Sequence, residues 1–524
     1  MTSRTISHYR LLHQLGAGGM GQVSLAEDEA LGREARVRAT QVTGVAQIHH
    51  SKEPVRMKPY KPLLTFVLGL VLLSTSLAAD HPNAAKAGMD PDRLTRIAQR
   101  MQAFVDQGTI AGAVGLVARH GVVASLDAVG YQELEGRKPM KTDTIFQIMS
   151  MTKPVTAVAL MMLMEEGQVV LGDPVEKYLP EFRGLWMLDG KRDDTPRTLK
   201  RPSRKMTLRD LLTHTSGMSE FPPAGASDLY GRMNLTLAEA VALYSQQPLE
   251  FEPGSRWMYS NPGIATLGRI IEVVSGTPYE KFVEQRILQP LGMKDSFFAA
   301  PPDKIGRIAM LYKLQNGKLQ RAGPEAYAGD PALYRKGAKY SGPEYAMYST
   351  AADLLAFYQM MLNGGTLGGK RILSKATVEM MTGLHTGTID PAGPPGRGYG
   401  LAWTVVKEPL GTLSLQSEGS YGHGGAFGTQ GWIDPKNDLI RIFLIQRSEG
   451  GDGMEANTFM AMAAAAITNE GLLGLHPHAP REAWRFARAR RDCRLNVWPS
   501  PAPQRVGSLT GCPTPGRAAR SFLT

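Results

Sequence analysis

Ser150 and Lys153 form the only Ser-x-x-Lys pattern in the sequence, and this pair is suited to acyl transfer. The apolar run that follows predicts a helix over residues 150–166, and residues three apart on a helix lie on one face. The lysine nitrogen could then take the serine proton, provided that burial lowers the lysine pKa from about 10.4 to near 7. A capping serine with an exposed lysine is the alternative interpretation.

Tyr259 and Asn261 form the only Tyr-x-Asn pattern, shortly after a predicted turn at Pro253 and Gly254. A tyrosine hydroxyl near Ser150 could carry protons between the nucleophile and the leaving group, and an asparagine could orient the lysine or a substrate amide. The alternative is a buried tyrosine whose hydroxyl is satisfied in the core.

The third candidate is His423-Gly424-Gly425-Ala426, a segment with little bulk before a predicted strand over residues 429–433. Such a segment is expected where a substrate lies against an edge strand. The backbone N–H of Ala426, together with the helix N-terminus at Ser150, could bind a developing oxyanion. An ordinary loop histidine at position 423 is equally compatible with the pattern.

Two further groupings of polar residues are interpreted as structural. His214, Thr215 and Ser216 lie close together, but in a leucine-rich helix-to-loop segment. The His-Gly-Gly of residues 423–425 is similar to the oxyanion loop of hormone-sensitive-type lipases, yet that loop precedes its nucleophile, and the sequence contains no G-x-S-x-G elbow.

In this order, the three motifs resemble the Ser-x-x-Lys, Tyr-x-Asn and Lys-Thr-Gly set of class C β-lactamases, D-alanyl-D-alanine carboxypeptidases and family VIII carboxylesterases. The stretches at residues 171–180, 211–217 and 290–293 look similar to the same family, so the resemblance covers residues 85–470. It implies a serine hydrolase of the β-lactamase/transpeptidase-like fold that needs no metal and no organic cofactor.

The resemblance also implies a role for each motif. Ser150 attacks a carbonyl carbon while Lys153 and Tyr259 share its proton, and water later releases the acyl group. The backbone N–H groups of Ser150 and Ala426 hold the oxyanion. The residues implied in substrate binding are Asn261, His423, Gly425 and Ala426.

The chain departs from the family pattern at His423, which occupies the position of the β-lactamase lysine. A lysine is a permanent cation suited to a substrate carboxylate, whereas a histidine with a pKa of about 6.5 is mostly neutral at pH 7. This favours an esterase or a D-amino-acid peptidase over an efficient penicillin hydrolase.

The predicted elements indicate an α/β (α+β) fold with one antiparallel sheet built from both ends of the hydrolase region, flanked by helices and interrupted by an inserted helical domain. Helices are predicted over residues 90–105 and 457–468. The predicted strands cover residues 113–118, 122–128, 399–406, 429–433 and 439–446. A cleft between sheet and helical insert would hold the substrate.

The net charge of +11 does not mark a nucleic-acid partner, because it lies at the chain ends. Residues 1–62 carry nine basic and five acidic side chains, residues 471–524 carry nine basic and two acidic ones, and residues 63–470 are neutral overall. Both cysteines, Cys493 and Cys512, lie in the Arg- and Pro-rich segment 471–524, which we expect to be a disordered tail.

The N-terminal 56 residues contain a G-x-G-x-x-G-x-V pattern at residues 16–23 that resembles the phosphate-covering loop of bacterial serine/threonine protein kinases. Arg38 occupies the position of that family's ATP-contacting lysine, and its later motifs are absent. A stranded fragment is therefore the favoured interpretation over a working domain, with ATP binding kept as a separate hypothesis.

Residues 57–79 have the three parts of a signal peptide: basic residues, the apolar run 63–73 and small residues near Ala78. Whether translation starts at Met1 or Met57, the basic residues favour export, with membrane attachment only if the segment is not cleaved. We therefore expect a periplasmic or secreted serine hydrolase acting on a small ester, a β-lactam or a D-amino-acid peptide. The alternative is a penicillin- or peptidoglycan-binding sensor that does not turn over.

Overall fold

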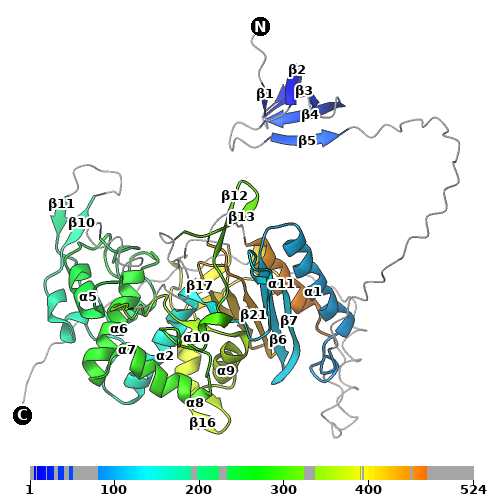
Figure 1. Ribbon diagram of the computed structural model, residues 1–524. Helices are drawn as coiled ribbons and strands as arrows, with labels where there is room; N and C mark the ends of the chain where they lie inside the picture. The colour runs from blue at the N-terminus through cyan, green and yellow to red at the C-terminus, as the bar shows by residue number, and fades with distance from the viewer. Residues whose placement is uncertain are drawn as a thin grey trace, which may run out of the picture. The chain divides into compact units, whose positions relative to one another are not determined.

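An eight-stranded antiparallel sheet forms the centre of the hydrolase region in the computed structural model (Figure 1). The strands follow the order β17-β18-β19-β20-β21-β6-β7-β8. Their bounds are β6 Gly112–Arg119, β7 Val122–Glu133, β8 Lys138–Pro139, β17 Arg397–Tyr399, β18 Thr404–Val406, β19 Tyr421–Gly424, β20 Gln430–Asp434 and β21 Leu439–Leu444. Since β6 pairs with β21 from Val114↔Leu444 to Arg119↔Leu439, the sheet joins both ends of the region as predicted.

The structure describes residues 81–190, 198–223, 233–323, 337–389, 391, 395–448 and 453–468, together with the strand backbone within residues 5–50. The chain divides into two units, Met1–Ser76 and Leu77–Thr524. The predicted signal segment 57–79 and the tail 471–524 lie outside the described residues, so both remain predictions. Within the described part, no helix has the length and apolar character needed to cross a bilayer.

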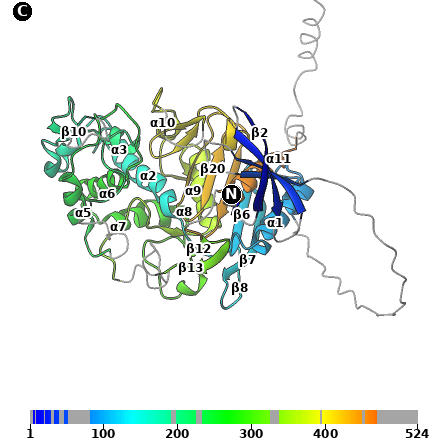
Figure 2. The ribbon, with the colours of Figure 1, turned by 90° about the horizontal axis from the view of Figure 1, so that it is seen from above.

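Helices cover both faces of the sheet (Figures 1 and 2). On one face lie α1 (Pro91–Asp106) and α11 (Met454–Ala465), and on the other lies α9 (Ala351–Leu362). All residues of β6 and β21 are buried, which explains why these strands are apolar almost throughout instead of alternating in polarity.

The middle of the chain forms the predicted helical insert. Its helices are α3 Leu208–Leu212, α5 Leu237–Ser245, α6 Asn261–Ser275, α7 Tyr279–Val283, α8 Gln289–Leu291 and α10 Lys375–Thr382. They gather around α2 (Thr152–Glu165), where every residue from Thr152 to Leu163 is buried. A helix that is apolar on all sides belongs in a core, so α2 is the shared centre of the insert and the sheet layer.

The structure differs from the sequence predictions at two strands. The predicted strand 399–406 is two strands, β17 and β18, joined by a turn in which the Gly400 N–H donates to the Trp403 carbonyl at 2.8 Å. Strand β19 was not predicted, because Tyr421-Gly-His-Gly424 lacks the β-branched and aliphatic residues that identify strands.

The N-terminal unit contains five consecutive strands that pair in sequence order. They are β1 Thr5–Ile6, β2 Tyr9–Gly18, β3 Gly21–Asp28, β4 Arg33–Ala39 and β5 Ala46–His50. The glycine-rich pattern falls at the β2–β3 hairpin, where Gly18 pairs with Gly21. Its similarity to a kinase loop remains a resemblance in sequence.

Candidate active site

Ser150 lies in the short 3-10 turn η1 (Met149–Met151) that leads into α2, so the predicted helix start is correct to within two residues. Met149 has a φ of 50°, a left-handed conformation that a long side chain rarely adopts and that is typical of strained functional sites. Ser150 is partly exposed, and among the described residues its N–H donates no hydrogen bond. The serine hydroxyl is thus presented at the end of a buried helix.

Lys153 is fully buried one turn further along α2. Its Nζ lies 3.0 Å from the Ser150 Oγ, 2.8 Å from the Asn261 Oδ1 and 2.8 Å from the Glu344 carbonyl oxygen. Burial lowers the pKa of Lys153 to about 7, against the opposing effect of the Glu344 carboxylate. The amine is therefore neutral in a large fraction of molecules at neutral pH.

These three contacts fix the direction of the Lys153 lone pair. A neutral amine has two N–H donors, and the oxygens of Asn261 and Glu344 can only accept hydrogen bonds at these positions. The remaining position on the nitrogen faces Ser150, whose hydroxyl can donate to it. Lys153 is placed to take the serine proton.

Tyr259 lies in the loop before α6 and shares a hydrogen bond with Ser150. Burial raises the pKa of Tyr259 above its usual value, so the phenol keeps its proton at neutral pH. Lys153 Nζ lies 4.7 Å from the centroid of the Tyr259 ring. The structure therefore brings Ser150, Lys153, Tyr259 and Asn261 together from two segments more than 100 residues apart.

The loop that carries Tyr259 is held by the segment interpreted as structural. The Ser260 N–H donates to the His214 Nδ1 at 3.1 Å, and the Met258 N–H donates to the His214 carbonyl at 2.9 Å. Ser260 then caps α6 by accepting a hydrogen bond from the Gly263 N–H. His214 is fully buried, and its pKa lies well below the usual value because of burial and the nearby Lys153.

His423 is buried on β19 and is neutral. Its Nδ1 lies 2.7 Å from the Gly424 carbonyl, so this nitrogen carries the proton, and its Nε2 lies 3.2 Å from the Tyr399 hydroxyl. Burial and Lys153 lower the pKa of His423 to about 3. The sequence suggested an edge strand here, but β19 lies between β18 and β20. Because β18 pairs only with Tyr421 and Gly422, the edge beside His423 is open locally.

The turn after β19 packs against the backbone that precedes Ser150. The Thr429 Oγ1 donates to the Ile148 carbonyl at 3.1 Å, and a Cβ on Gly425 would lie 2.3 Å from that carbonyl oxygen and 2.2 Å from the Thr429 Oγ1. Only glycine fits at position 425. Ala426 is exposed, and its N–H has no partner among the described residues, as an oxyanion donor requires.

Two neighbours of the site were not identified from the sequence. Tyr399 contacts His423, and Glu344 contacts Lys153 through its carbonyl oxygen. For Glu344, the available signal was an acidic residue that interrupts an otherwise uncharged stretch over residues 340–351. In the described part of the chain, no group of His, Cys, Asp and Glu side chains is arranged to hold a metal ion.

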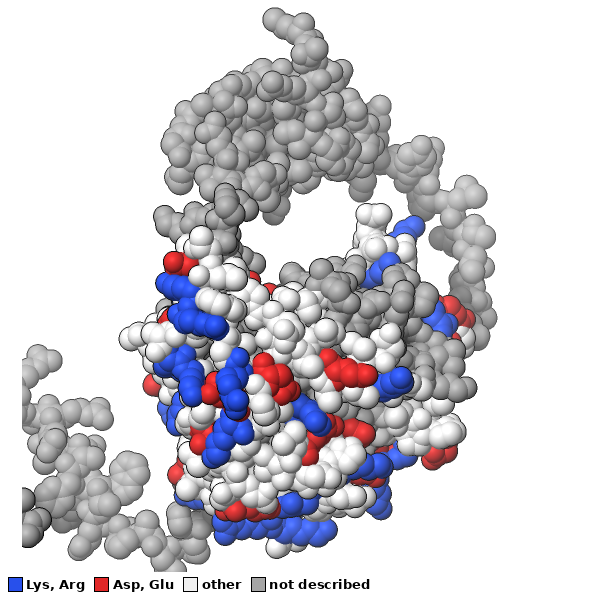
Figure 3. All heavy atoms as spheres, turned by 90° about the vertical axis from the view of Figure 1, so that its left-hand side faces the viewer, with Lys and Arg blue, Asp and Glu red and all other residues white. Residues whose placement is uncertain are grey.

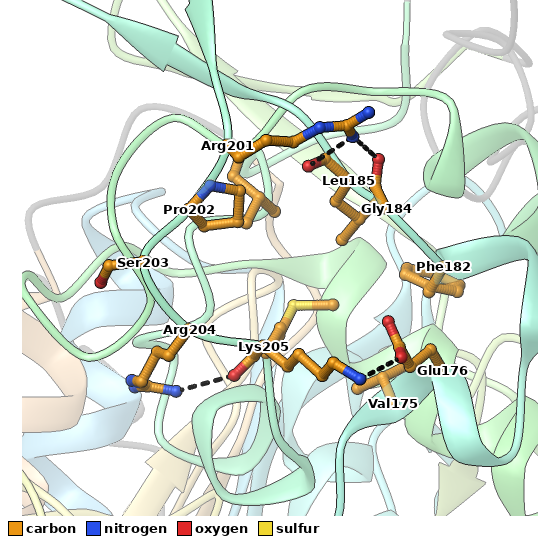
Figure 4. Close-up of a pocket in the computed structure, with 12 residues that line it drawn as sticks. Val175, Glu176, Phe182, Gly184, Leu185, Arg201, Pro202, Ser203, Arg204 and Lys205 are labelled. Carbon is orange, nitrogen blue, oxygen red and sulfur yellow. Dashed lines mark hydrogen bonds and ion pairs between the residues drawn. The ribbon is translucent and has the colours of Figure 1, made fainter.

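A separate cavity of about 310 Å³ lies in the insert and is not lined by Ser150, Lys153 or Tyr259 (Figure 4). Its basic residues already have partners: Lys205 pairs with Glu176, and Arg204 pairs with Asp210. Arg201 reaches the carbonyl oxygens of Gly184 and Leu185 and stacks on Trp186. We therefore place the chemistry at Ser150, because the hydrogen-bonded nucleophile and base lie there.

On the face shown in Figure 3, basic and acidic side chains lie interspersed. Pairs such as Lys200–Asp189 and Lys281–Glu284, both from the insert, account for part of this pattern. The distribution agrees with the zero net charge of residues 63–470.

Comparisons with known proteins extend the same assignment. A family model described as Beta-lactamase matches residues 97–465. Esterase EstB from Burkholderia gladioli is 30% identical over 397 residues, which cover 70% of this chain and 95% of EstB. An Escherichia coli (strain K12) protein with the provisional name D-alanyl-D-alanine carboxypeptidase is 27% identical, with 72% and 89% covered. The solved structure of EstCE1, a hydrolase with promiscuous acyltransferase activity, is 27% identical with a TM-score of 0.59, covering 72% of this chain and 97% of EstCE1.

Proposed function

Because this chain belongs to the β-lactamase family of serine hydrolases, we propose that it hydrolyses small carboxylic esters through an acyl-enzyme on Ser150. The observation that carries the proposal is the 3.0 Å contact between the Lys153 Nζ and the Ser150 Oγ, with Lys153 buried and its other two contacts occupied by fixed acceptors. A serine hydroxyl needs such a base, because it is a weak nucleophile while protonated.

In the proposed reaction, the Ser150 Oγ forms a bond to the ester carbonyl carbon while its proton passes to the Lys153 Nζ. The N–H groups of Ser150 and Ala426 stabilise the resulting oxyanion. As the carbonyl re-forms, the bond to the alcohol breaks and the alkoxide receives a proton through Tyr259. Water then attacks the acyl-enzyme, releasing the acid and returning the proton to Ser150.

The neutral His423 supports an ester in preference to a β-lactam or a peptide with a free carboxylate. At this position, a family lysine would supply a fixed positive charge for a substrate carboxylate, and a buried neutral imidazole supplies none. The name of EstB points in the same direction. D-amino-acid peptides and β-lactams remain the other substrate classes to compare.

We further propose that residues 57–79 direct export to the periplasm or the exterior, with membrane attachment only if the segment is retained. The support is the basic, apolar and small-residue order of this segment. Fractionation of cells that express the full chain tests this, with Leu68→Arg in the apolar run as the variant expected to stay in the cytoplasm. Activity confined to the cytoplasm for the unmodified chain would exclude export.

The decisive experiment is intact mass and turnover of the full chain with p-nitrophenyl butyrate, nitrocefin and a D-alanyl-D-alanine peptide. We expect fastest turnover of the ester, and neither adduct nor turnover with Ser150→Ala. A stable adduct on Ser150 without turnover would replace the hydrolase by a sensor that only binds. Equal turnover by the unmodified chain and Ser150→Ala would refute the assignment of the nucleophile.

A further inference from the structure

Glu344 is a buried acidic residue beside the Ser150–Lys153 pair, with 1% of its surface exposed. A carboxylate in a protein interior is costly unless it is hydrogen-bonded or faces a positive charge. Its Oε1 accepts a hydrogen bond from the hydroxyl of the buried Tyr340 at 2.8 Å, and the Tyr244 hydroxyl lies 3.4 Å from that of Tyr340. The chain therefore maintains a solvent-shielded polar cluster at this point.

The backbone of Glu344 is fixed against α2. The Pro343 carbonyl accepts a hydrogen bond from the Thr156 Oγ1 at 2.6 Å, and the Met347 N–H donates to the Thr152 Oγ1 at 3.2 Å. Between these two anchors, the Glu344 carbonyl oxygen lies 2.8 Å from the Lys153 Nζ. The position of this acceptor is thus set by the contact of a whole segment with the helix that carries the lysine.

The charged and titratable groups around Lys153 differ in what they contribute. His214 and His423 are neutral, and Tyr259 is a protonated phenol, so these three groups carry no charge at neutral pH. Glu344 is the acidic group that raises the pKa of Lys153 against its burial. The same carboxylate raises the pKa of Tyr244, Tyr259 and Tyr279, which keeps those phenols protonated.

We propose that Glu344 is a positioning residue for acyl transfer, whose carbonyl oxygen aims the Lys153 lone pair at Ser150 and whose buried carboxylate is the counter-charge of the Lys153 ammonium. This inference rests on the proposed hydrolysis for its role, but not for its electrostatics. Each time Lys153 takes the serine proton, it becomes a cation inside the core. A nearby buried anion stabilises that cation, so proton uptake by Lys153 stays accessible at neutral pH.

The carboxylate is tested with Glu344→Gln, which keeps the carbonyl contact and removes the charge. Without the anion, Lys153 holds its proton less tightly, so its titration midpoint falls. We expect a downward shift of about one pH unit. The midpoint is measured in the full chain from the 13Cε resonance of Lys153, assigned by its loss in Lys153→Met. The acidic limb of the rate of ester hydrolysis should move by the same amount.

Three further variants make the test specific. Glu344→Met has nearly the same length, contains no polar group that must be satisfied, and should give the same shift if Glu344→Gln does not fold. Glu344→Asp keeps the charge and should restore most of the midpoint. Glu455→Gln removes another buried carboxylate, which pairs with Arg447 on the far side of the sheet, and should leave the midpoint unchanged.

The outcomes separate this inference from the proposed function. A midpoint that stays in place or rises in both Glu344→Gln and Glu344→Met would overturn the role of the carboxylate even if the ester is hydrolysed. A falling midpoint in a chain that hydrolyses no ester would support the electrostatic role and refute the proposed function instead.

Discussion

The ring of His214 packs against the ring of Tyr259, with the two centroids 4.5 Å apart. His214 itself has a φ of 58°, and through its Nδ1 and its carbonyl oxygen it accepts hydrogen bonds from the residues on both sides of Tyr259. One buried histidine thereby sets both the backbone path and the ring orientation of the tyrosine.

This relationship predicts that His214→Asn slows the acylation step while leaving substrate affinity nearly unchanged. Asparagine tolerates the positive φ, but it cannot fill the space of the ring, so Tyr259 loses its support. We expect kcat for p-nitrophenyl butyrate to fall about 10- to 100-fold, the scale of a small misplacement of a reacting group. His120→Asn, at another histidine with positive φ, is the control and should keep the full rate.

The pH profile of kcat/KM should rise with pH through an acidic limb near pH 7. Lys153 must lose its proton to act as the base, and its pKa is about 7. His423, with a pKa of about 3, cannot produce this limb. His423→Gln should therefore leave the limb in place, and a limb that disappears in this variant would show that the histidine is the titrating group.

Stability should also depend on pH through Lys153. The unfolded chain binds a proton at this side chain below its usual pKa of about 10.5, whereas the folded chain binds it only below about 7. Between these values the unfolded state holds more protons, so the free energy of unfolding rises with pH. Urea unfolding at pH 7.5 and 9.5 should show this rise, and Lys153→Met should reduce it. An identical rise in both proteins would mean that Lys153 is charged in the fold.

Gly425→Ala should impair both the oxyanion turn and stability. The added Cβ would lie 2.3 Å from the Ile148 carbonyl oxygen, so the turn must shift away from the segment that carries Ser150. Loss of one oxyanion donor lowers kcat about 10²–10³-fold, and overpacking costs about 1–3 kcal/mol. Gly172→Ala, at a glycine with open space around it, provides the comparison in kinetics and thermal melts. Normal kcat in Gly425→Ala would argue against Ala426 as a donor.

Several features of the fold could be predicted from the sequence because they depend on local patterns. The stripe of Leu94, Ile97 and Met101 identified α1, and all three residues are buried. The apolar strands at both ends of the hydrolase region indicated one sheet with an inserted helical domain, and the pairing of β6 with β21 confirms it. Strand β19 escaped prediction because Gly422 and Gly424 lack the side chains that identify strands.

The sequence alone determined the identities and order of the three motifs, since residue spacing and helical periodicity are local properties that place Ser150 and Lys153 on one face. Only the tertiary structure decided that Lys153 is buried, that His214 supports Tyr259, and that Glu344 lies beside the lysine. The pKa of a side chain depends on the groups that surround it in space. In this site those groups come from segments nearly 200 residues apart, which no local pattern records.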